Sequence, residues 1–273
     1  SSYSKVERMR THLNREEKVS FPNALGYTLS GVLHIPENPA GKPAVILCHG
    51  MESNKESEKL TILGRRFSER GISALRFDFF CAGESSGRFA EITYTGEVAD
   101  TRAAFELIQG HRPGKIGMIG SSMGGSVSLL FASQERRVSA VATLAAPAHP
   151  ERIIDTLLSQ DQVEDWRQQG FVTYHGRRIN SHFLDDVRKI DIPKAAIEIF
   201  CPSLIIHGDS DDTVPAEDAH EIHTLIPGPK RLSIIEGADH RFSDPRHLSR
   251  AVEESFDWMV QHLFGDSKTT GNH

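Results

Sequence analysis

One short segment of the chain carries a serine in a setting that could make it a nucleophile. The segment "GSSMG" (residues 120–124) fits the pattern Gly-x-Ser-x-Gly only with Ser122 at its centre. This pattern allows a sharp turn between a strand and a helix, because small neighbours leave room for a strained serine backbone. Ser122 is therefore the candidate nucleophile, and Ser121 is expected to be structural. A helix that begins with a serine cap has a similar local sequence. A candidate base and acid elsewhere in the chain are therefore needed to identify Ser122 as a nucleophile.

A serine hydroxyl needs a histidine base, and that histidine needs a carboxylate to orient it. The segment "IIHGDSDDTVP" places three aspartates directly after an apolar run. Asp209 lies too near the end of the expected strand to reach back, and Asp212 is expected to cap the next helix or to face solvent. Asp211, in the middle of the loop, is therefore the candidate acid, although a turn and a helix cap would also explain these aspartates.

The candidate base is His240, in "IEGADHRFSDP". It follows the next apolar run, a glycine and a small residue, so its side chain can fold over the edge of a sheet. His220 and His223 lie instead on a predicted amphipathic helix, where a solvated face explains them better than a zinc site does. Serine, acid and base thus occur in the chain order that α/β-hydrolases use.

Acyl transfer also needs two backbone N–H groups that bind the oxyanion. Met123 follows the candidate nucleophile and is expected to supply one. Met51, in "CHGMESN", is expected to supply the other, after a turn made by His49 and Gly50. Asp78 precedes the nucleophile in the chain and is expected to brace its own loop by hydrogen bonds.

These residues follow the strands of a regular α/β alternation. The predicted strands cover residues 16–21, 27–36, 43–50, 72–79, 115–120, 137–147, 203–208 and 230–237. The predicted helices cover residues 57–71, 95–110, 124–135, 215–226 and 249–264. The first two strands read as an antiparallel pair. The rest predict a mostly parallel, eight-stranded sheet with helices on both faces, in which the catalytic candidates share the carboxyl edge.

The alternation breaks at residues 148–198. We expect this segment to be a cap inserted over the carboxyl ends of the strands, between core segments 1–147 and 199–273. Two helices (150–169 and about 183–190) and a small hairpin are predicted within it. Its aromatic residues either line the substrate pocket or pack the cap's own core. These candidates are Trp166, Phe171, Tyr174 and Phe183.

Composition excludes several classes of protein. The 273 residues carry a net charge of −6, which argues against a nucleic-acid partner. No apolar run approaches the roughly 20 residues that span a bilayer, and the polar amino-terminal residues 1–18 have no apolar signal region. The three cysteines are widely spaced, which is typical of reduced thiols in a cytoplasmic protein. We expect no metal and no cofactor, and a homodimer is compatible with the sequence.

Five segments together resemble the α/β-hydrolase superfamily. They are "AVILCHG", "LRFDFFCAGESSGRF", "GSSMGG", "LIIHGDSDDTVP" and "IEGADHRFSDP". More narrowly they are similar to bacterial cinnamoyl and feruloyl esterases and their relatives, which are often labelled S33 aminopeptidase-like. The resemblance covers roughly residues 16–147 and 200–263. It implies Ser122, His240 and Asp211 as the triad, and the amides of Met51 and Met123 as the oxyanion hole.

The sequence therefore predicts a cofactor-independent serine hydrolase, a carboxylesterase that acts on small acyl or aryl (hydroxycinnamoyl-like) esters through an acyl-enzyme. A peptidase or amidase with the same triad stays open, with Glu164, Asp165, Asp185 and Asp186 as candidate acids for a free α-amine. A thioesterase is a further alternative. A non-catalytic ligand-binding protein on the same fold is the remaining class, and the three intact candidates argue against it.

Overall fold

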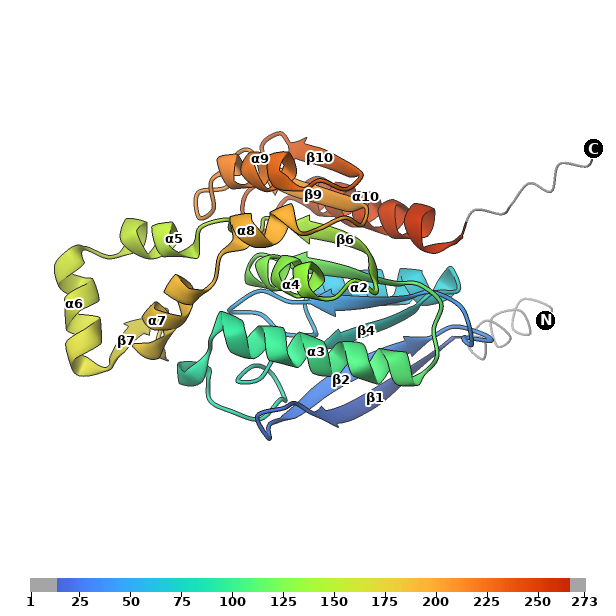
Figure 1. Cartoon of the computed structure of the whole chain (residues 1–273), viewed down its shortest axis with the longest axis horizontal. Helices are drawn as coiled ribbons and strands as arrows, with labels where there is room; N and C mark the ends of the chain where they lie inside the picture. Colours follow the sequence, from blue (N-terminus) through green and yellow to red (C-terminus); the bar gives the residue numbers. More distant parts are fainter. Residues whose placement is uncertain (1–13, 266–273) are drawn as a thin grey trace, which may run out of the picture.

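The computed structural model describes residues 14–265, and it contains one large sheet with helices on both faces (Figure 1). Eight strands form this sheet in the order β1-β2-β4-β3-β5-β6-β9-β10. Their bounds are β1 Arg15–Pro22, β2 Thr28–Ile35, β3 Ala44–Cys48, β4 Ser73–Phe77, β5 Ile116–Ser121, β6 Val138–Leu144, β9 Ser203–Gly208 and β10 Lys230–Ile235. Among the described strands of this sheet, the pairs β1–β2 and β2–β4 are antiparallel and the others are parallel. The predicted fold class and the predicted antiparallel pair are therefore confirmed.

The helices pack on the sheet in two sets. One face is covered by α2 (Glu58–Glu69) and α10 (Pro245–Leu263), and the other by α3 (Tyr94–Gly110), α4 (Met123–Gln134) and α9 (Ala216–Leu225). Strand β3 shows why both faces need cover. Ile46 and Cys48 belong to one buried cluster, whereas Val45 and Leu47 belong to the other, because successive side chains point to opposite faces.

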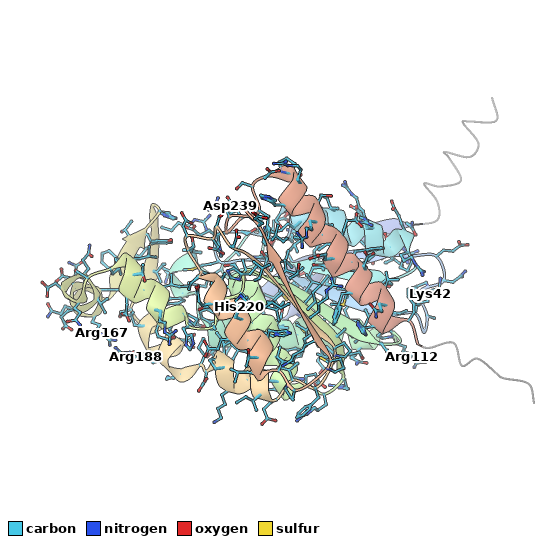
Figure 2. The ribbon with its side chains drawn as sticks, turned by 90° about the horizontal axis from the view of Figure 1, so that it is seen from above. Lys42, Arg112, Arg167, Arg188, His220 and Asp239 are labelled. Carbon is cyan, nitrogen blue, oxygen red and sulfur yellow. The ribbon has the colours of Figure 1, made fainter. Side chains whose placement is uncertain are left out.

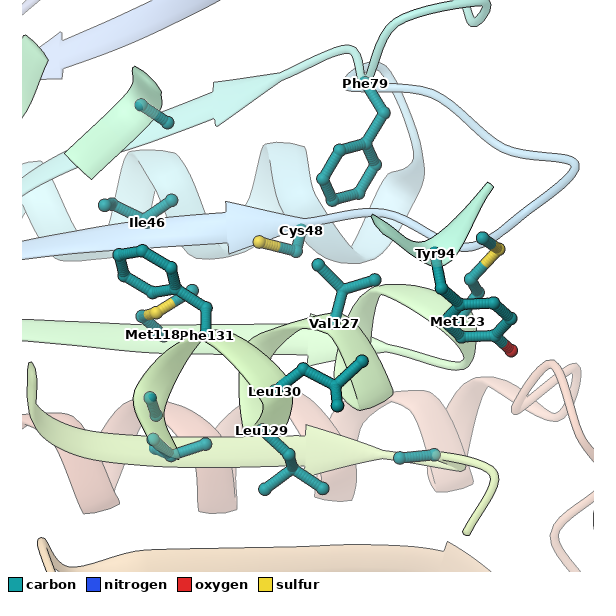
Figure 3. Close-up of a cluster of buried hydrophobic side chains, with 14 of the residues drawn as sticks. Ile46, Cys48, Phe79, Tyr94, Met118, Met123, Val127, Leu129, Leu130 and Phe131 are labelled. Carbon is teal, nitrogen blue, oxygen red and sulfur yellow. The ribbon is translucent and has the colours of Figure 1, made fainter. Parts of the chain in front are cut away.

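The cluster beneath α4 fixes the helix that follows the candidate nucleophile. Val127 and Phe131 of α4 lie over Ile46, Cys48 and Met118 of the strands, and all five side chains are buried (Figure 3). The helix is apolar on nearly every side, as expected for a helix buried in the middle of a domain. Its amino end therefore has a fixed position at the sheet edge.

Residues 148–198 fold into four short helices and a hairpin. These are α5 (Pro150–Leu157), α6 (Gln160–Gln169), β7 (Phe171–Tyr174), β8 (Arg177–Asn180), α7 (His182–Lys189) and α8 (Ile192–Ile197). The predicted hairpin is confirmed, and its two turn residues, His175 and Gly176, have the positive φ of 46° and 75° that a two-residue hairpin turn demands. The last helix, α8, packs on α4 and α9 rather than on the rest of the segment.

The single helix expected at residues 150–169 is wrong, because the chain forms two helices there. Leu158 is extended, with φ −126° and ψ 139°. Ser159 then starts α6 with a capping box, in which its side chain accepts from the Gln162 amide and the Gln162 side chain accepts from the Ser159 amide. The signature Ser-x-x-Gln was present in the sequence and marks a helix start.

The segment from α5 to α7 projects from one end of the sheet (Figure 1). Arg167 and Arg188 mark this end, whereas Lys42 and Arg112 lie at the opposite end of the molecule (Figure 2). Lys42 and Arg112 precede the amino ends of β3 and β5, so the projecting segment lies on the side of their carboxyl ends. It is tied to the core by Asp186 of α7, which accepts a hydrogen bond from the Tyr94 amide at 2.7 Å.

Two sequence expectations concern a signal region and a membrane-spanning segment. The absence of a signal region was argued from residues 1–18, of which 1–13 lie outside the described residues. Between residues 14 and 265, no helix has both the length and the apolar character that crossing a bilayer requires.

Candidate active site

Ser122 occupies a strained turn between β5 and α4. Its backbone angles, φ 52° and ψ −122°, lie in a region that residues other than glycine rarely adopt. The flanking glycines make this turn possible. A Cβ on Gly120 would lie 2.2 Å from the Gly124 carbonyl oxygen, and a Cβ on Gly124 would lie 2.3 Å from the His49 carbonyl oxygen. The pattern read in the sequence is thus a strand–turn–helix that holds the Ser122 hydroxyl at the carboxyl edge.

The three candidate catalytic residues form one chain of hydrogen bonds. The Ser122 Oγ lies 2.9 Å from His240 Nε2, and His240 Nδ1 lies 2.7 Å from Asp211 Oδ2. An ionised carboxylate only accepts hydrogen bonds, so Nδ1 carries the proton and Nε2 presents a lone pair to the serine hydroxyl. This arrangement can remove the Ser122 proton and stabilise the imidazolium that results.

The carboxylate of Asp211 is completely satisfied. Its Oδ1 accepts from the amides of Thr213 and Val214 at 2.9 and 2.8 Å. Burial works to raise its pKa, but the hydrogen bonds from His207 and His240 outweigh that effect and hold the pKa well below its usual range. Asp211 is therefore ionised at any pH at which His240 can act as a base. Asp209 accepts instead from the Gly237 amide, and Asp212 is exposed and accepts from the Thr213 hydroxyl at 3.3 Å.

A second histidine beside Asp211 was missed in the sequence. His207, in β9, is fully buried, and its Nε2 lies 2.9 Å from the Val214 carbonyl oxygen and 3.2 Å from Asp211 Oδ2. The signal was available, because a histidine inside the apolar run "SLIIHG" must be buried and therefore needs a hydrogen-bond partner.

The loop after β3 brings Met51 to the site. His49 donates from Nδ1 to the Gly50 carbonyl oxygen at 2.6 Å and accepts from the Phe79 amide on Nε2 at 3.0 Å. Burial lowers the pKa of His49 to about 4, so this ring stays neutral and keeps that tautomer. The structural role expected for His49 is confirmed.

The same loop is tied to the neighbouring loop by a buried ion pair. Asp78 accepts from the Lys55 amide and from the Lys55 ammonium, both at 2.7 Å, and from the Glu84 amide at 2.9 Å. The bracing role expected for Asp78 is confirmed, whereas Lys55 as its partner was not foreseen. Met51 and Met123 both reach the wall of the cavity described next, and Met123 is the first residue of α4, where backbone N–H groups have no partner inside the helix.

A cavity of about 510 Å³ opens above Ser122. Loops that follow β3, β5, β9 and β10 form most of its wall, together with Tyr94 at the start of α3, Ile153 of α5 and the tip of the β7–β8 hairpin. The catalytic candidates Ser122 and His240 lie in this wall, as do the oxyanion candidates Met51 and Met123. A cavity of this size accommodates a small organic molecule.

Of the four aromatic residues expected to line the pocket, only Tyr174 does so. The other three candidates do not lie in the cavity wall, so the alternative that they line the pocket is wrong. They are Trp166, Phe171 and Phe183. Trp166 and Phe183 are buried and stack at 6.2 Å between ring centres, and the Trp166 indole donates to the Ile179 carbonyl oxygen at 3.0 Å. Phe171 is covered by the Arg178 guanidinium at 3.6 Å. These side chains are used in packing the small segment itself, which is too short to form a core without them.

None of the four acids considered for an α-amine, Asp165 included, lies in the wall of this cavity. Asp186 caps α3, Asp185 lies 3.6 Å from Arg167, and Glu164 accepts from Gln168. In the part of the chain that the structure describes, no group of three or more His, Cys, Asp or Glu side chains gathers as a metal site would require. The expectation that no metal or cofactor is needed stays a prediction.

Comparison with known proteins agrees with this fold. The family model described as serine aminopeptidase, S33 matches residues 39–186, more than half of the chain. The 2,6-dihydropseudooxynicotine hydrolase of Paenarthrobacter nicotinovorans is 28% identical over 257 residues, which cover 89% of this chain and 64% of that one. Esterase FrsA of Escherichia fergusonii is 22% identical over 250 residues, 87% of this chain and 57% of that one. The chain thus spans less than two thirds of both relatives.

Solved structures give the same result for the fold. Est1E from Butyrivibrio proteoclasticus, with bound ferulic acid, superimposes with a TM-score of 0.81 at 23% identity over 90% of this chain and 99% of that one. Alpha/beta hydrolase domain-containing protein 10 from mouse superimposes with a TM-score of 0.77 at 19% identity, over 90% and 99% of the two chains.

Proposed function

The chain belongs to the serine aminopeptidase S33 family of α/β-hydrolases, and from this premise we propose that it is a carboxylic ester hydrolase with Ser122, His240 and Asp211 as its triad. One observation carries the proposal. The strained serine is in hydrogen-bond contact with His240, and His240 is in contact with an ionised acid, at the floor of a cavity large enough for a small substrate. A protein that only binds ligands has no need of this arrangement.

The proposed reaction has two half-reactions. His240 Nε2 takes the proton of Ser122 Oγ, and Oγ attacks the ester carbonyl to form a tetrahedral intermediate. The backbone amides of Met51 and Met123 bind its oxyanion. The carbon–oxygen bond to the alcohol then breaks, and His240 passes its proton to that oxygen. Water attacks the acyl-enzyme in the same way, which releases the acid and restores Ser122.

We propose that the projecting segment from α5 to α7 is the cap that selects the substrate. It contributes Ile153 and the hairpin residues Tyr174 and His175 to the cavity wall. The aromatic ring of Tyr174 suits a small acyl or aryl ester. The likeness to Est1E, whose structure holds ferulic acid, supports a hydroxycinnamoyl-like ester among the candidates.

An amidase or aminopeptidase with the same triad is the second candidate, and the family description favours it. Recognition of a free α-amine requires a carboxylate that is available to accept a hydrogen bond from it. The acids in the cavity wall are Glu52, Asp212 and Asp239. Glu52 and Asp239 already bind His175 and Ser243, and Asp212 accepts from the Thr213 hydroxyl at 3.3 Å. This occupancy favours an ester over a peptide with a free amino end.

The two adjacent serines offer a matched test of the proposal. Ser122→Ala should lower the turnover of p-nitrophenyl acetate by about 10⁴-fold or more, the scale of a lost triad member. Ser121→Ala, purified in parallel, should retain most of the activity, because within residues 14–265 it is the Ser122 hydroxyl and not that of Ser121 that is hydrogen-bonded to His240. Near-equal activity of Ser122→Ala and the unaltered protein would refute the assignment. A panel of short acyl esters, hydroxycinnamates, thioesters and aminoacyl anilides then separates the candidate substrates.

A further inference from the structure

Two basic side chains lie in the cavity wall beside His240. Lys59 comes from the first turn of α2, and Arg241 directly follows His240 in the chain. Both also line a second hollow of about 200 Å³, formed by α2, the loop after β10 and the start of α10. They therefore stand at the junction between the catalytic cavity and this adjoining hollow.

Two of the acids nearby are already engaged, and a third, Glu58, is exposed and directly precedes Lys59 in the chain. Both carboxylate oxygens of Asp239 accept from Ser243, one from its amide at 2.7 Å and one from its hydroxyl at 2.6 Å. Both oxygens of Glu52 lie 3.0 Å from His175 Nδ1, and one lies 4.0 Å from an Arg241 nitrogen. Arg241 is thus held only loosely, and its side chain is 77% exposed.

Lys59 lacks even such a partner. Over residues 14–265, its ammonium forms no hydrogen bond and no ion pair, and it lies 5.9 Å from the centre of the Phe242 ring. Lys59 is half-buried, and burial, followed by the charge of Arg241, lowers its pKa. A cation in the first turn of a helix is also unfavourable. A bound anion would offset all three costs.

Arg241 directly follows His240, and Lys59 lines the same adjoining hollow as Arg241 does. His240 Nε2 protonates the oxygen of the leaving alcohol, so the alcohol portion of the ester extends past His240 and toward the residue that follows it. We propose that Lys59 and Arg241 form a subsite for an anionic group, such as a carboxylate, carried by the alcohol portion of the substrate. This inference rests on the proposed ester hydrolysis and narrows its substrate class.

The chemistry of the pair suits a carboxylate. The planar guanidinium of Arg241 can donate two parallel hydrogen bonds to it, and Lys59 supplies a second positive charge at the same junction. The subsite would also release a negatively charged alcohol more slowly at low salt, because exposed charges are screened as ionic strength rises.

Two acetate esters that share the phenol ring, one with a free carboxylate on it and one with the methyl ester of that carboxylate, test the subsite. The anionic probe is 4-acetoxybenzoate, and its neutral match is methyl 4-acetoxybenzoate. We expect the unaltered protein to show the higher kcat/KM for the anionic probe. In Lys59→Met the ratio of the two kcat/KM values should fall about tenfold, and in Arg241→Gln it should fall in the same direction. Lys115→Met, an exposed lysine before β5, is the matched control and should leave the ratio unchanged. An equal ratio in the unaltered protein and both variants would overturn the subsite.

A binding measurement tests the subsite independently of ester hydrolysis. The product of the anionic probe, 4-hydroxybenzoate, is titrated by calorimetry into Ser122→Ala and into the double variant with Lys59→Met. Weaker binding to the double variant supports the subsite even if no ester is hydrolysed, whereas equal binding overturns it. Hydrolysis of neither probe by the unaltered protein counts only against the ester-hydrolase proposal.

Discussion

His207 lies 3.2 Å from Asp211, so the acid of the proposed triad has a histidine behind it as well as His240 in front. His207 Nε2 and His240 Nδ1 face the same carboxylate oxygen of Asp211, Oδ2. The His207 proton is shared with the Val214 carbonyl oxygen, which holds the acid loop to the end of β9. His207 is therefore a positioning residue that acts through Asp211.

Replacing His207 by phenylalanine should lower kcat for p-nitrophenyl acetate about tenfold, since a hydrogen bond to a charged group is lost. The acid limb of the pH–rate profile should also move to higher pH, because the hydrogen bond from His207 lowers the pKa of Asp211 and its loss raises that pKa. His220→Phe, on the exposed side of α9, is the control and should have neither effect. An unchanged rate and profile in His207→Phe would remove this role.

The turn at Ser122 makes a prediction about stability. In Gly124→Ala the new Cβ would lie 2.3 and 2.5 Å from the carbonyl oxygens of His49 and Cys48, which are backbone atoms and cannot rotate away. We expect a loss of about 1–3 kcal/mol in the free energy of unfolding. Gly110→Ala, at the end of α3 with nothing within 4 Å of its Cβ, is the matched control. Thermal unfolding of both variants measures the difference, and equal midpoints would contradict the steric argument.

The sequence predicted the residues whose role depends on chain order and local pattern. Ser122 follows from the glycines beside it, and Asp211 and His240 follow from loops that come after apolar strands. The three-dimensional partners of these residues could not be predicted in the same way. Lys55 and Asp78 are 23 residues apart, and no periodicity in the chain pairs them.

The projecting segment shows the same limit. Whether an aromatic side chain faces the substrate or the segment's own interior depends on how α6, α7 and the hairpin pack together. Phe183 lies between Trp166 and Tyr94, at 6.2 and 6.1 Å between ring centres, and is used in that packing. Tyr174 lies next to the hairpin turn and packs only partly buried against this core, so that it also reaches the cavity wall.

A buried acid makes stability depend on pH. Glu97 of α3 is fully buried, and neither carboxylate oxygen has a hydrogen-bond partner among the described residues. Burial, together with the charges of Asp100 and Asp186, raises its pKa well above the usual value. The folded protein thus keeps a proton that the unfolded chain releases, so this residue costs stability as pH rises above about 4.3.

Glu97→Gln should therefore raise the midpoint of thermal unfolding at pH 8, and the gain should shrink toward pH 4. Glu106→Gln, an exposed acid on the same helix, serves as the comparison and should show no such trend. A gain that is the same at both pH values would contradict a titration of Glu97 as its cause.

The hairpin of the proposed cap is held over the site by His175 and Glu52. The two side chains meet at 3.0 Å, and Glu52 follows Met51 directly. In Glu52→Gln the charge is lost, and hydrogen exchange of the amides in residues 171–180 should become faster. Glu37→Gln, an exposed acid before β3, should leave that exchange unchanged. Equal exchange in Glu52→Gln would mean that the hairpin is held by other contacts.

The central claim is that Ser122 is a nucleophile activated by His240. Reaction with a fluorophosphonate, followed by mass spectrometry of the intact protein and of its peptides, tests this claim most directly. We expect one adduct, on Ser122, that forms far more slowly in His240→Gln and is absent in Ser122→Ala. Failure of the unaltered protein to react, or an adduct on another residue, would contradict it.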